Sequence, residues 1–228
     1  MRDGPSQPLV AWLFSGARVS PPPTEVEERA FRRYCHEFNQ VFSAVATLTT
    51  AFAFLAWWPL DRWVLPPEVG LLYADLRTAL LVFGVVGFAI NRAVPVGPGA
   101  SLAAALGLIA FSAILGGFLG RMDGLLGLQY LFALPFGGVL LALSLPWRTA
   151  TVLAAMASSW GAAVVAAGGL PALAFGTLST TIGIGAISIL IGEALFRFMR
   201  ARHVTEQRLV ALRAHLEERI DEQGRDLR

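Results

Sequence analysis

An acidic and a basic residue lie close together near the end of the last long apolar run of this chain. Glu193 precedes Arg197 by four residues, which is the favourable order for an ion pair on one face of a helix. Because an ionisable group within an apolar span is costly, it is a functional hypothesis by default. We predict that Glu193 and Arg197 form a polar contact that changes with helix packing; the alternative is an ion pair that only marks the membrane boundary.

A proline within another apolar run marks a second candidate site. Pro135 removes a backbone hydrogen bond in the middle of that run, which predicts a kink. Gln129 and Tyr130 lie before the kink, and Trp160 and Thr180 stand in later clusters of polar residues. Together these side chains could line a pocket for a lipophilic small molecule. The alternative is a kink without a ligand, with the hydroxyl clusters serving only to pack helices together.

Metal, haem and Schiff-base chemistry are not expected from this sequence. The three histidines, His36, His203 and His215, lie outside the middle of every apolar run and share no helix face at ligand spacing. All 18 basic residues are arginine, so no lysine is present to form a Schiff base. The sequence also contains no kinase glycine loop and no cyclase motif. We therefore predict no catalytic residue and no cofactor, although the chain could be the non-catalytic part of a kinase or cyclase.

The elements that must position these residues follow from the composition. The 228-residue chain is 55% hydrophobic and 15% charged, with a mean hydropathy of +0.60, whereas soluble domains are about 45–50% apolar and about 25% charged. The charge is unevenly distributed, with ten charged residues from Val41 to Phe196 and fourteen from Arg197 to Arg228. This pattern predicts a polytopic membrane domain followed by a solvated tail.

Six segments contain about 20 mainly apolar residues, the length that a helix needs to cross the hydrocarbon core of a bilayer. They predict an all-α membrane protein, a six-transmembrane helix bundle with a cytoplasmic C-terminal coiled coil. Gly116 and Gly120 have the GxxxG spacing of closely packed membrane helices. The predicted spans are Gln40–Pro59, Leu72–Asn91, Gly99–Leu119, Leu125–Leu145, Trp147–Gly168 and Pro171–Phe196.

The distribution of arginine predicts the orientation of these spans. Placing the N-terminus inside assigns nine flanking arginines to the cytoplasm and three to the outside, as the positive-inside rule requires. The prediction is a multi-pass protein of the bacterial inner (plasma) membrane, with its N-terminus and C-terminus both cytoplasmic. The net charge of +2 and the pI near 9.2 come from these flanking arginines, so no nucleic-acid partner is expected.

The sequence divides into three predicted parts. Residues 1–23 are expected to be a flexible cytoplasmic leader that ends in three prolines. Thr24 and Glu27 have the spacing of a capping box, so a lead-in helix should begin there and continue into the first span. Residues 24–196 then form the six-helix membrane domain with its lead-in helix, and residues 197–228 form a cytoplasmic helix.

The last span should continue as one uninterrupted helix, because no proline follows it and no glycine stands between Gly192 and Gly224. Its apolar residues then recur at steps of three, four and four, which is typical of a short coiled coil with a stutter. An isolated helix of this polarity is marginal in water, so we predict a parallel homodimer; the alternative is a solvated tail that packs on nothing. The predicted dimer stripe is Leu209, Leu212, Leu216 and Ile220.

One segment of this tail carries a resemblance. AHLEERIDEQGRDLR, at residues 214–228, resembles the LEERVAERTRELR type of linker that joins membrane sensors to the dimerisation helix of bacterial sensor histidine kinases. It departs from that linker at Gln223 and Gly224. The six-span layout is similar to six-span quorum-sensing histidine kinases, membrane anchors of class III adenylyl cyclases, membrane serine/threonine kinases and diguanylate cyclases. The resemblance implies a two-component or related receptor module, and it carries no catalytic residue onto this chain.

We therefore expect a membrane sensor or anchor that passes a membrane or lipophilic-ligand signal through the last span into a dimeric coiled coil, with Glu193 and Arg197 in signal transmission. The chain is expected to be either the membrane part of a longer receptor or a stand-alone version of that part. In the longer receptor, a cytoplasmic effector domain, most simply a histidine kinase, would follow Arg228. A cyclase or serine/threonine kinase could replace that effector. The expected partners are the lipid bilayer, a second copy, a lipophilic small molecule and the effector. Two alternatives are a small-molecule transporter or channel subunit and a passive dimeric membrane anchor.

Overall fold

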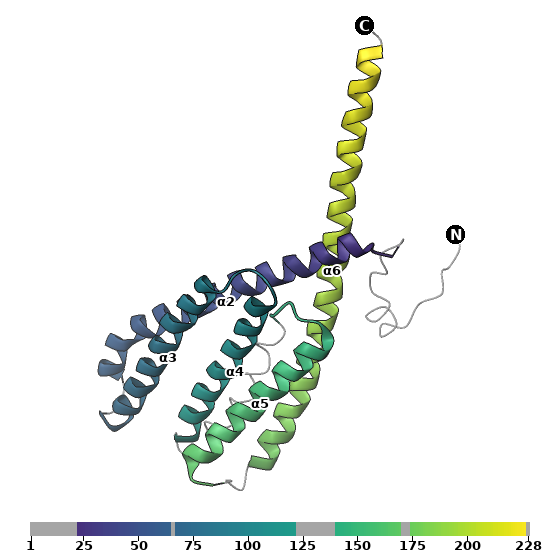
Figure 1. Ribbon diagram of the computed structural model, residues 1–228. Helices are drawn as coiled ribbons and strands as arrows, with labels where there is room; N and C mark the ends of the chain where they lie inside the picture. The colour runs from purple at the N-terminus through teal and green to yellow at the C-terminus, as the bar shows by residue number, and fades with distance from the viewer. Residues whose placement is uncertain (1–21, 65–66, 122–139, 170–173, 227–228) are drawn as a thin grey trace, which may run out of the picture. The chain divides into compact units, whose positions relative to one another are not determined.

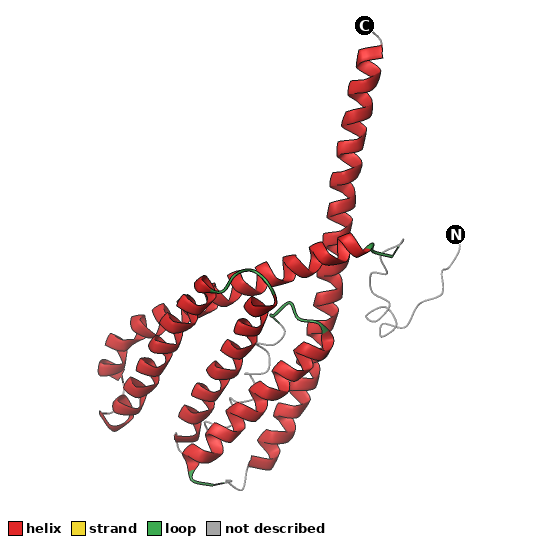
Figure 2. Cartoon of the chain, viewed as in Figure 1, coloured by secondary structure: helices red, strands yellow, loops and turns green. Residues whose placement is uncertain are grey.

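The computed structural model describes residues 22–64, 67–121, 140–169 and 174–226 (Figure 1). Every regular element in these ranges is an α-helix (Figure 2), which confirms the predicted all-α class. The helices are α2 (Glu25–Val64), α3 (Pro67–Ala93), α4 (Pro98–Arg121), α5 (Leu145–Ala167) and α6 (Ala174–Asp226).

Four of the described helices are long and apolar enough to cross a membrane, which supports a membrane-embedded protein. They correspond to the predicted second, third, fifth and sixth spans. The predicted first span lies within α2, and most of the predicted fourth span lies outside the described residues, so the count of six stays a prediction. The four candidate spans are Gly70–Ala93, Pro98–Arg121, Leu145–Ala167 and Leu178–Gln223.

The end of the predicted fourth span is wrong, because residues 140–144 are not helical. The Asn39 side chain accepts a hydrogen bond from the Ala142 N–H at 2.7 Å and donates one to the Ala142 carbonyl at 3.1 Å. This pairing replaces the bonds that a helix would give Ala142. Leu141 and Leu143 on either side of it are buried against Ala104, so hydrophobic burial also holds this segment in place.

The helix ends follow from local sequence. The capping box is confirmed: the Thr24 N–H donates to the Glu27 carboxylate at 2.7 Å, and the Glu27 N–H donates to the Thr24 hydroxyl at 3.3 Å. Helix α5 carries Pro146 in its first turn, after the extended Ser144, and it is capped at its end by Gly168, whose φ of 73° is left-handed. The amide of Gly169 then bonds back to the Val164 carbonyl at 3.1 Å.

The chain forms two compact units, which we describe separately. The terminal unit comprises the described parts of Met1–Tyr34 and Ala194–Arg228, and the central unit is Cys35–Glu193. Helix α2 and helix α6 each contribute residues to both units.

Glycines bring the helices of the central unit together in two close pairs. A Cβ atom added to Gly116 or Gly120 of α4 would overlap the α5 backbone at Ser159 or Ala163, so the GxxxG spacing coincides with a close helix contact here. Helix α3 meets α2 in the same way, because a Cβ atom on Gly84 would lie 2.7 Å from the Thr47 carbonyl oxygen. Small residues therefore set the closest helix approaches in this unit, as is usual where lipid surrounds the helices.

A buried polar group joins α2 to α4. The Asn39 amide donates to the Ser101 hydroxyl oxygen at 2.9 Å, and that oxygen lies 2.8 Å from His36 Nδ1. If the Ser101 hydroxyl donates its proton to His36, then Nδ1 carries no proton and the imidazole is neutral. Burial lowers the pKa of His36, which favours this neutral form. The group orients α2 against α4, and the Asn39 side chain also holds the backbone of Ala142.

A second polar group joins α2 to the end of α3. The Gln40 amide donates to the carbonyl oxygens of Asn91 and Val94, at 2.8 and 2.6 Å. The Asn91 amide in turn donates to the Ser43 hydroxyl at 3.0 Å. A helix C-terminus leaves its last carbonyls without partners in the helix. Gln40 of α2 supplies donors to two such carbonyls, and so it holds the end of α3 against α2.

Candidate functional site

The structure gives Glu193 an ion-pair partner that the spacing of the sequence did not indicate. The guanidinium Nη1 of Arg148, near the start of α5, donates to the Glu193 carboxylate at 2.9 Å. The Arg148 side chain has no exposed surface, and that of Glu193 is 13% exposed. Glu193 therefore fixes α6 to α5 at the last residue of the central unit.

The position of Arg148 depends on two further features. Its second terminal nitrogen donates to the carbonyl of Leu143, in the segment that Asn39 holds. Gly192 leaves room for the guanidinium, because a Cβ atom there would lie 2.6 Å from Arg148 Nε. A buried charge requires both a partner and hydrogen bonds, and α6 supplies the partner and the space at adjacent residues.

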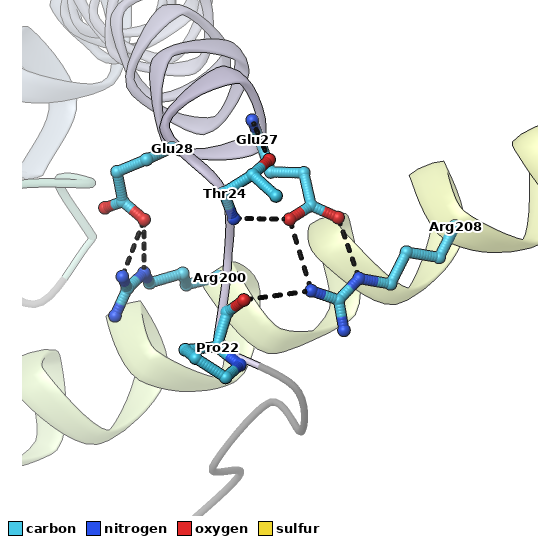
Figure 3. A network of polar contacts seen from close by, with 6 residues as sticks. All are labelled: Pro22, Thr24, Glu27, Glu28, Arg200 and Arg208. Atoms are coloured by element: carbon cyan, nitrogen blue, oxygen red, sulfur yellow. Dashed lines mark hydrogen bonds and ion pairs between the residues drawn. The ribbon is translucent and has the colours of Figure 1, made fainter.

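In the terminal unit, two acidic residues of α2 bind two arginines of α6, as Figure 3 shows. Arg208 forms a two-pronged contact with Glu27, at 2.7 and 3.2 Å, and Arg200 binds one oxygen of Glu28 through two nitrogens at 2.6 and 3.0 Å. Hydrogen bonds between a guanidinium and a carboxylate are stronger than those between neutral groups, because both partners are charged. We call these four residues, Glu27, Glu28, Arg200 and Arg208, the ion-pair cluster.

Glu27 serves the helix start and the cluster at once (Figure 3). One carboxylate oxygen accepts from the Thr24 backbone amide, and both oxygens accept from Arg208. The hydrogen bond from Arg208, followed by the bond from the Thr24 amide, lowers the pKa of Glu27 to about 2. The same contact raises the pKa of Arg208. Glu27 and Arg208 are therefore both charged at any physiological pH.

Aromatic side chains pack beside the cluster in the terminal unit. Phe31 meets Phe196 edge-on, with ring centroids 5.3 Å apart, and Tyr34 stacks on His203 at 4.8 Å. Val204, which follows His203 on α6, has no exposed surface. The start of α2 therefore binds α6 through an apolar and aromatic centre with ion pairs beside it.

The predicted dimer stripe begins directly after this contact. Leu209, Leu212, Leu216 and Ile220 are each 50–66% exposed in the single chain. They belong to the continuous helix α6, which has no break at residues 197–204 and so confirms the predicted uninterrupted helix. The stripe is apolar surface that no described residue of the same chain covers to any large extent. The coiled coil stays a prediction.

The predicted ligand pocket is not assembled by the described residues. Gln129, Tyr130 and Pro135 lie outside them. Trp160 is buried on α5 beside Ala163, whereas the Thr180 side chain on α6 is exposed. A shared ligand for these residues stays a prediction.

Among the described residues, no group of three or more His, Cys, Asp and Glu side chains could hold a metal ion. Comparison of the chain with protein-family models, with curated proteins and with solved structures found no match in any of the three. The geometry of the chain itself must therefore support any functional conclusion.

Sequence reasoning missed the ion-pair cluster and the role of Arg148. A signal was present for the cluster, since Phe196, Arg200, Val204 and Arg208 recur every four residues and so share one face of α6. Arg148 looked like an ordinary arginine flanking a span, and its burial depends on Gly192, far along the chain.

The Arg148–Glu193 pair predicts a clear stability pattern. Arg148→Leu should lower the free energy of unfolding by about 3–5 kcal/mol, because it removes the buried guanidinium that the largely buried Glu193 carboxylate binds. The double variant Arg148→Leu with Glu193→Leu should recover most of that loss, since no isolated charge remains. Denaturant unfolding in mixed micelles would measure both. Arg92→Leu, at the exposed end of α3, is the matched control, and a double variant no more stable than the single one would contradict the pair.

The ion-pair cluster predicts a contact that resists acid. The pKa of Glu27 falls from the usual 4.5 to about 2 in the folded chain, so its stabilising effect is complete above 4.5 and is lost as the pH falls toward 2. Spin labels at Val26→Cys and Val210→Cys, in a Cys35→Ala background, should give one narrow distance distribution from pH 7 to 4.5 that broadens below.

Two variants show whether this acid transition belongs to the cluster. Arg208→Gln should broaden the distance distribution already at pH 7, because Glu27 loses its cation. Arg213→Gln, exposed further along α6, should behave as the parent chain. A parent distribution that broadens between pH 7 and pH 5 would contradict the assignment.

Proposed function

We propose that this chain is the membrane module of a signalling receptor. It senses the state of the membrane or a lipophilic ligand and passes that signal through α6 into a dimeric cytoplasmic coiled coil. The observation that carries the proposal is the single helix from Ala174 to Asp226, whose first part is apolar and whose last part is polar with an exposed apolar stripe.

The length of α6 supports this role. Its 53 residues far exceed the roughly 20 that cross a bilayer, so much of the helix extends beyond the hydrocarbon. A change in tilt or rotation at the end of the apolar part reaches the polar part directly, because an α-helix resists bending where no proline or glycine interrupts it, as from Glu193 to Gln223. Glu193 and Arg197 then lie at the point where the signal leaves the membrane.

The second copy is supported by the stripe. A polar helix with one exposed apolar stripe is marginal alone in water, and a partner helix buries the stripe. Since both copies stand in one membrane with the same orientation, the two helices run parallel. A histidine kinase is the output that the tail resemblance favours, and a cyclase or serine/threonine kinase would be driven through the same coiled coil.

Disulfide trapping tests the dimer. In a Cys35→Ala background, Leu216→Cys should cross-link two copies in native membranes under mild oxidation, because the stripe faces its counterpart. Ala214→Cys is the matched control, since it is also exposed but lies on the opposite side of α6. Its cross-linking should be at least about fivefold slower.

The outcome also separates the proposal from its rivals. Equal cross-linking at residues 214 and 216, or none at either, would refute a dimer built on the stripe. A second experiment fuses the chain to a kinase or cyclase domain and varies the membrane composition. If the dimer forms but the activity of the fused domain does not change, the chain is a passive anchor and not a sensor.

A further inference from the structure

An open groove lies between α3 and the close pair formed by α4 and α5, all within the central unit. Its volume is about 1,090 Å³, at the upper end of the roughly 300–1,000 Å³ of usual ligand pockets. The walls are apolar. They include Leu76, Ala79 and Val82 of α3, Ile114 and Phe118 of α4, and Val165 of α5.

Charged residues stand at one end of this groove. Asp75 of α3 and Arg121, the last residue of α4, both line it, and their side chains form an ion pair at 3.7 Å. The two side chains are 74% and 58% exposed. The pair is thus loose and accessible, and it offers an anionic and a cationic group side by side.

The charged end and the apolar walls of the groove lie at the depths of a lipid head group and of its acyl chains. Arg121 ends a candidate span and Asp75 lies near the start of another, so the pair lies where lipid head groups lie. The apolar lining extends back along α4 from Arg121 to Ala113, a rise of about 12 Å. An acyl chain whose head group reached the ion pair would therefore run along the groove toward the middle of the span.

We propose that this groove binds one phospholipid with a zwitterionic head group that carries a primary ammonium, as in phosphatidylethanolamine. The ammonium binds Asp75, the phosphate binds Arg121, and one acyl chain fills the apolar walls. An unfilled groove would leave its lining without van der Waals partners, and the opposite charges at its end complement a head group that carries both signs. This site goes beyond the signalling proposal and does not include the residues of the predicted pocket.

Native mass spectrometry tests the site. The whole chain is reconstituted into vesicles of equal parts phosphatidylethanolamine, phosphatidylcholine and phosphatidylglycerol, and then released into mild detergent. We expect one lipid per chain, with phosphatidylethanolamine favoured about fivefold, because the quaternary ammonium of phosphatidylcholine donates no hydrogen bond and phosphatidylglycerol offers no cation to Asp75. Equal retention of the three lipids, or none, would overturn the proposal.

Matched variants locate the lipid within the chain. Gly117→Leu should fill the groove and abolish retention, since a Cβ atom there meets its nearest neighbour, Ala162, at an ordinary 3.8 Å. Gly161→Leu, where a Cβ atom meets nothing within 4 Å, should retain the lipid as the parent does. Unchanged retention in Gly117→Leu would overturn the site.

A third variant keeps the test decisive if Gly117→Leu fails to fold. Asp75→Asn with Arg121→Gln should keep one lipid but lose the head-group preference, and a preference that survives this change would overturn the assignment. Disulfide formation between copies at Val165→Cys, with no lipid retained, would assign the groove to a second copy instead. Cross-linking at Leu216→Cys is independent of lipid, so the dimer and the lipid site can fail separately.

Discussion

The backbone hydrogen bonds of α6 continue without a break from Ala174 to Asp226, and the Arg148–Glu193 pair, the ion-pair cluster and the apolar stripe are all built on this helix. An interruption within it would leave amide and carbonyl groups without partners, which is costly, above all where no water can replace them. The sequence keeps glycine and proline out of the region from Glu193 to Gln223. A helix of this kind transmits displacement along its axis far better than a jointed linker does.

The two parts of α6 are held by different chemistry. In the central unit, the buried Arg148 binds Glu193, and adjacent Gly192 makes space for it. In the terminal unit, partly exposed ion pairs and a small aromatic group bind α6 to the start of α2. Buried pairs are little affected by salt, whereas exposed ones are screened. The contact of the terminal unit is therefore the one that ionic conditions can modulate.

The central unit has closely packed helix pairs at some places and an open groove at another. Glycine contacts bring α2 close to α3 and α4 close to α5, and the buried group of Asn39 and Ser101 joins the two pairs at one end. At the other end, the exposed pair of Asp75 and Arg121 is the described polar link, and the apolar groove opens there. A ligand in that groove would contact α3, α4 and α5 together.

Much of the fold could be predicted from local sequence. The capping box of Thr24 and Glu27 depends on residues within one helical turn, and the unbroken α6 follows from the lack of proline and glycine from Glu193 to Gln223, so both could be predicted along the chain. The GxxxG spacing of Gly116 and Gly120 did not indicate which helix those glycines would meet. The end of the fourth predicted span failed because Asn39, more than a hundred residues away, binds the backbone of Ala142.

The site was harder to predict than the fold for the same physical reason. Glu193 was identified from its cost in an apolar environment, but its partner Arg148 lies 45 residues earlier on another helix. The partners in the ion-pair cluster are separated by more than 170 residues. Spacing along one helix reports which residues share a face, and it says nothing of which other helix that face will meet.

Hydrogen–deuterium exchange of the whole chain in lipid nanodiscs tests the continuity of α6 most directly. The account predicts that amides from Glu193 to Val204 exchange as slowly as those on either side, with protection declining only toward Asp226. Rapid exchange confined to Arg197–Val204, between two protected segments, would reveal a joint in the helix and contradict transmission through it.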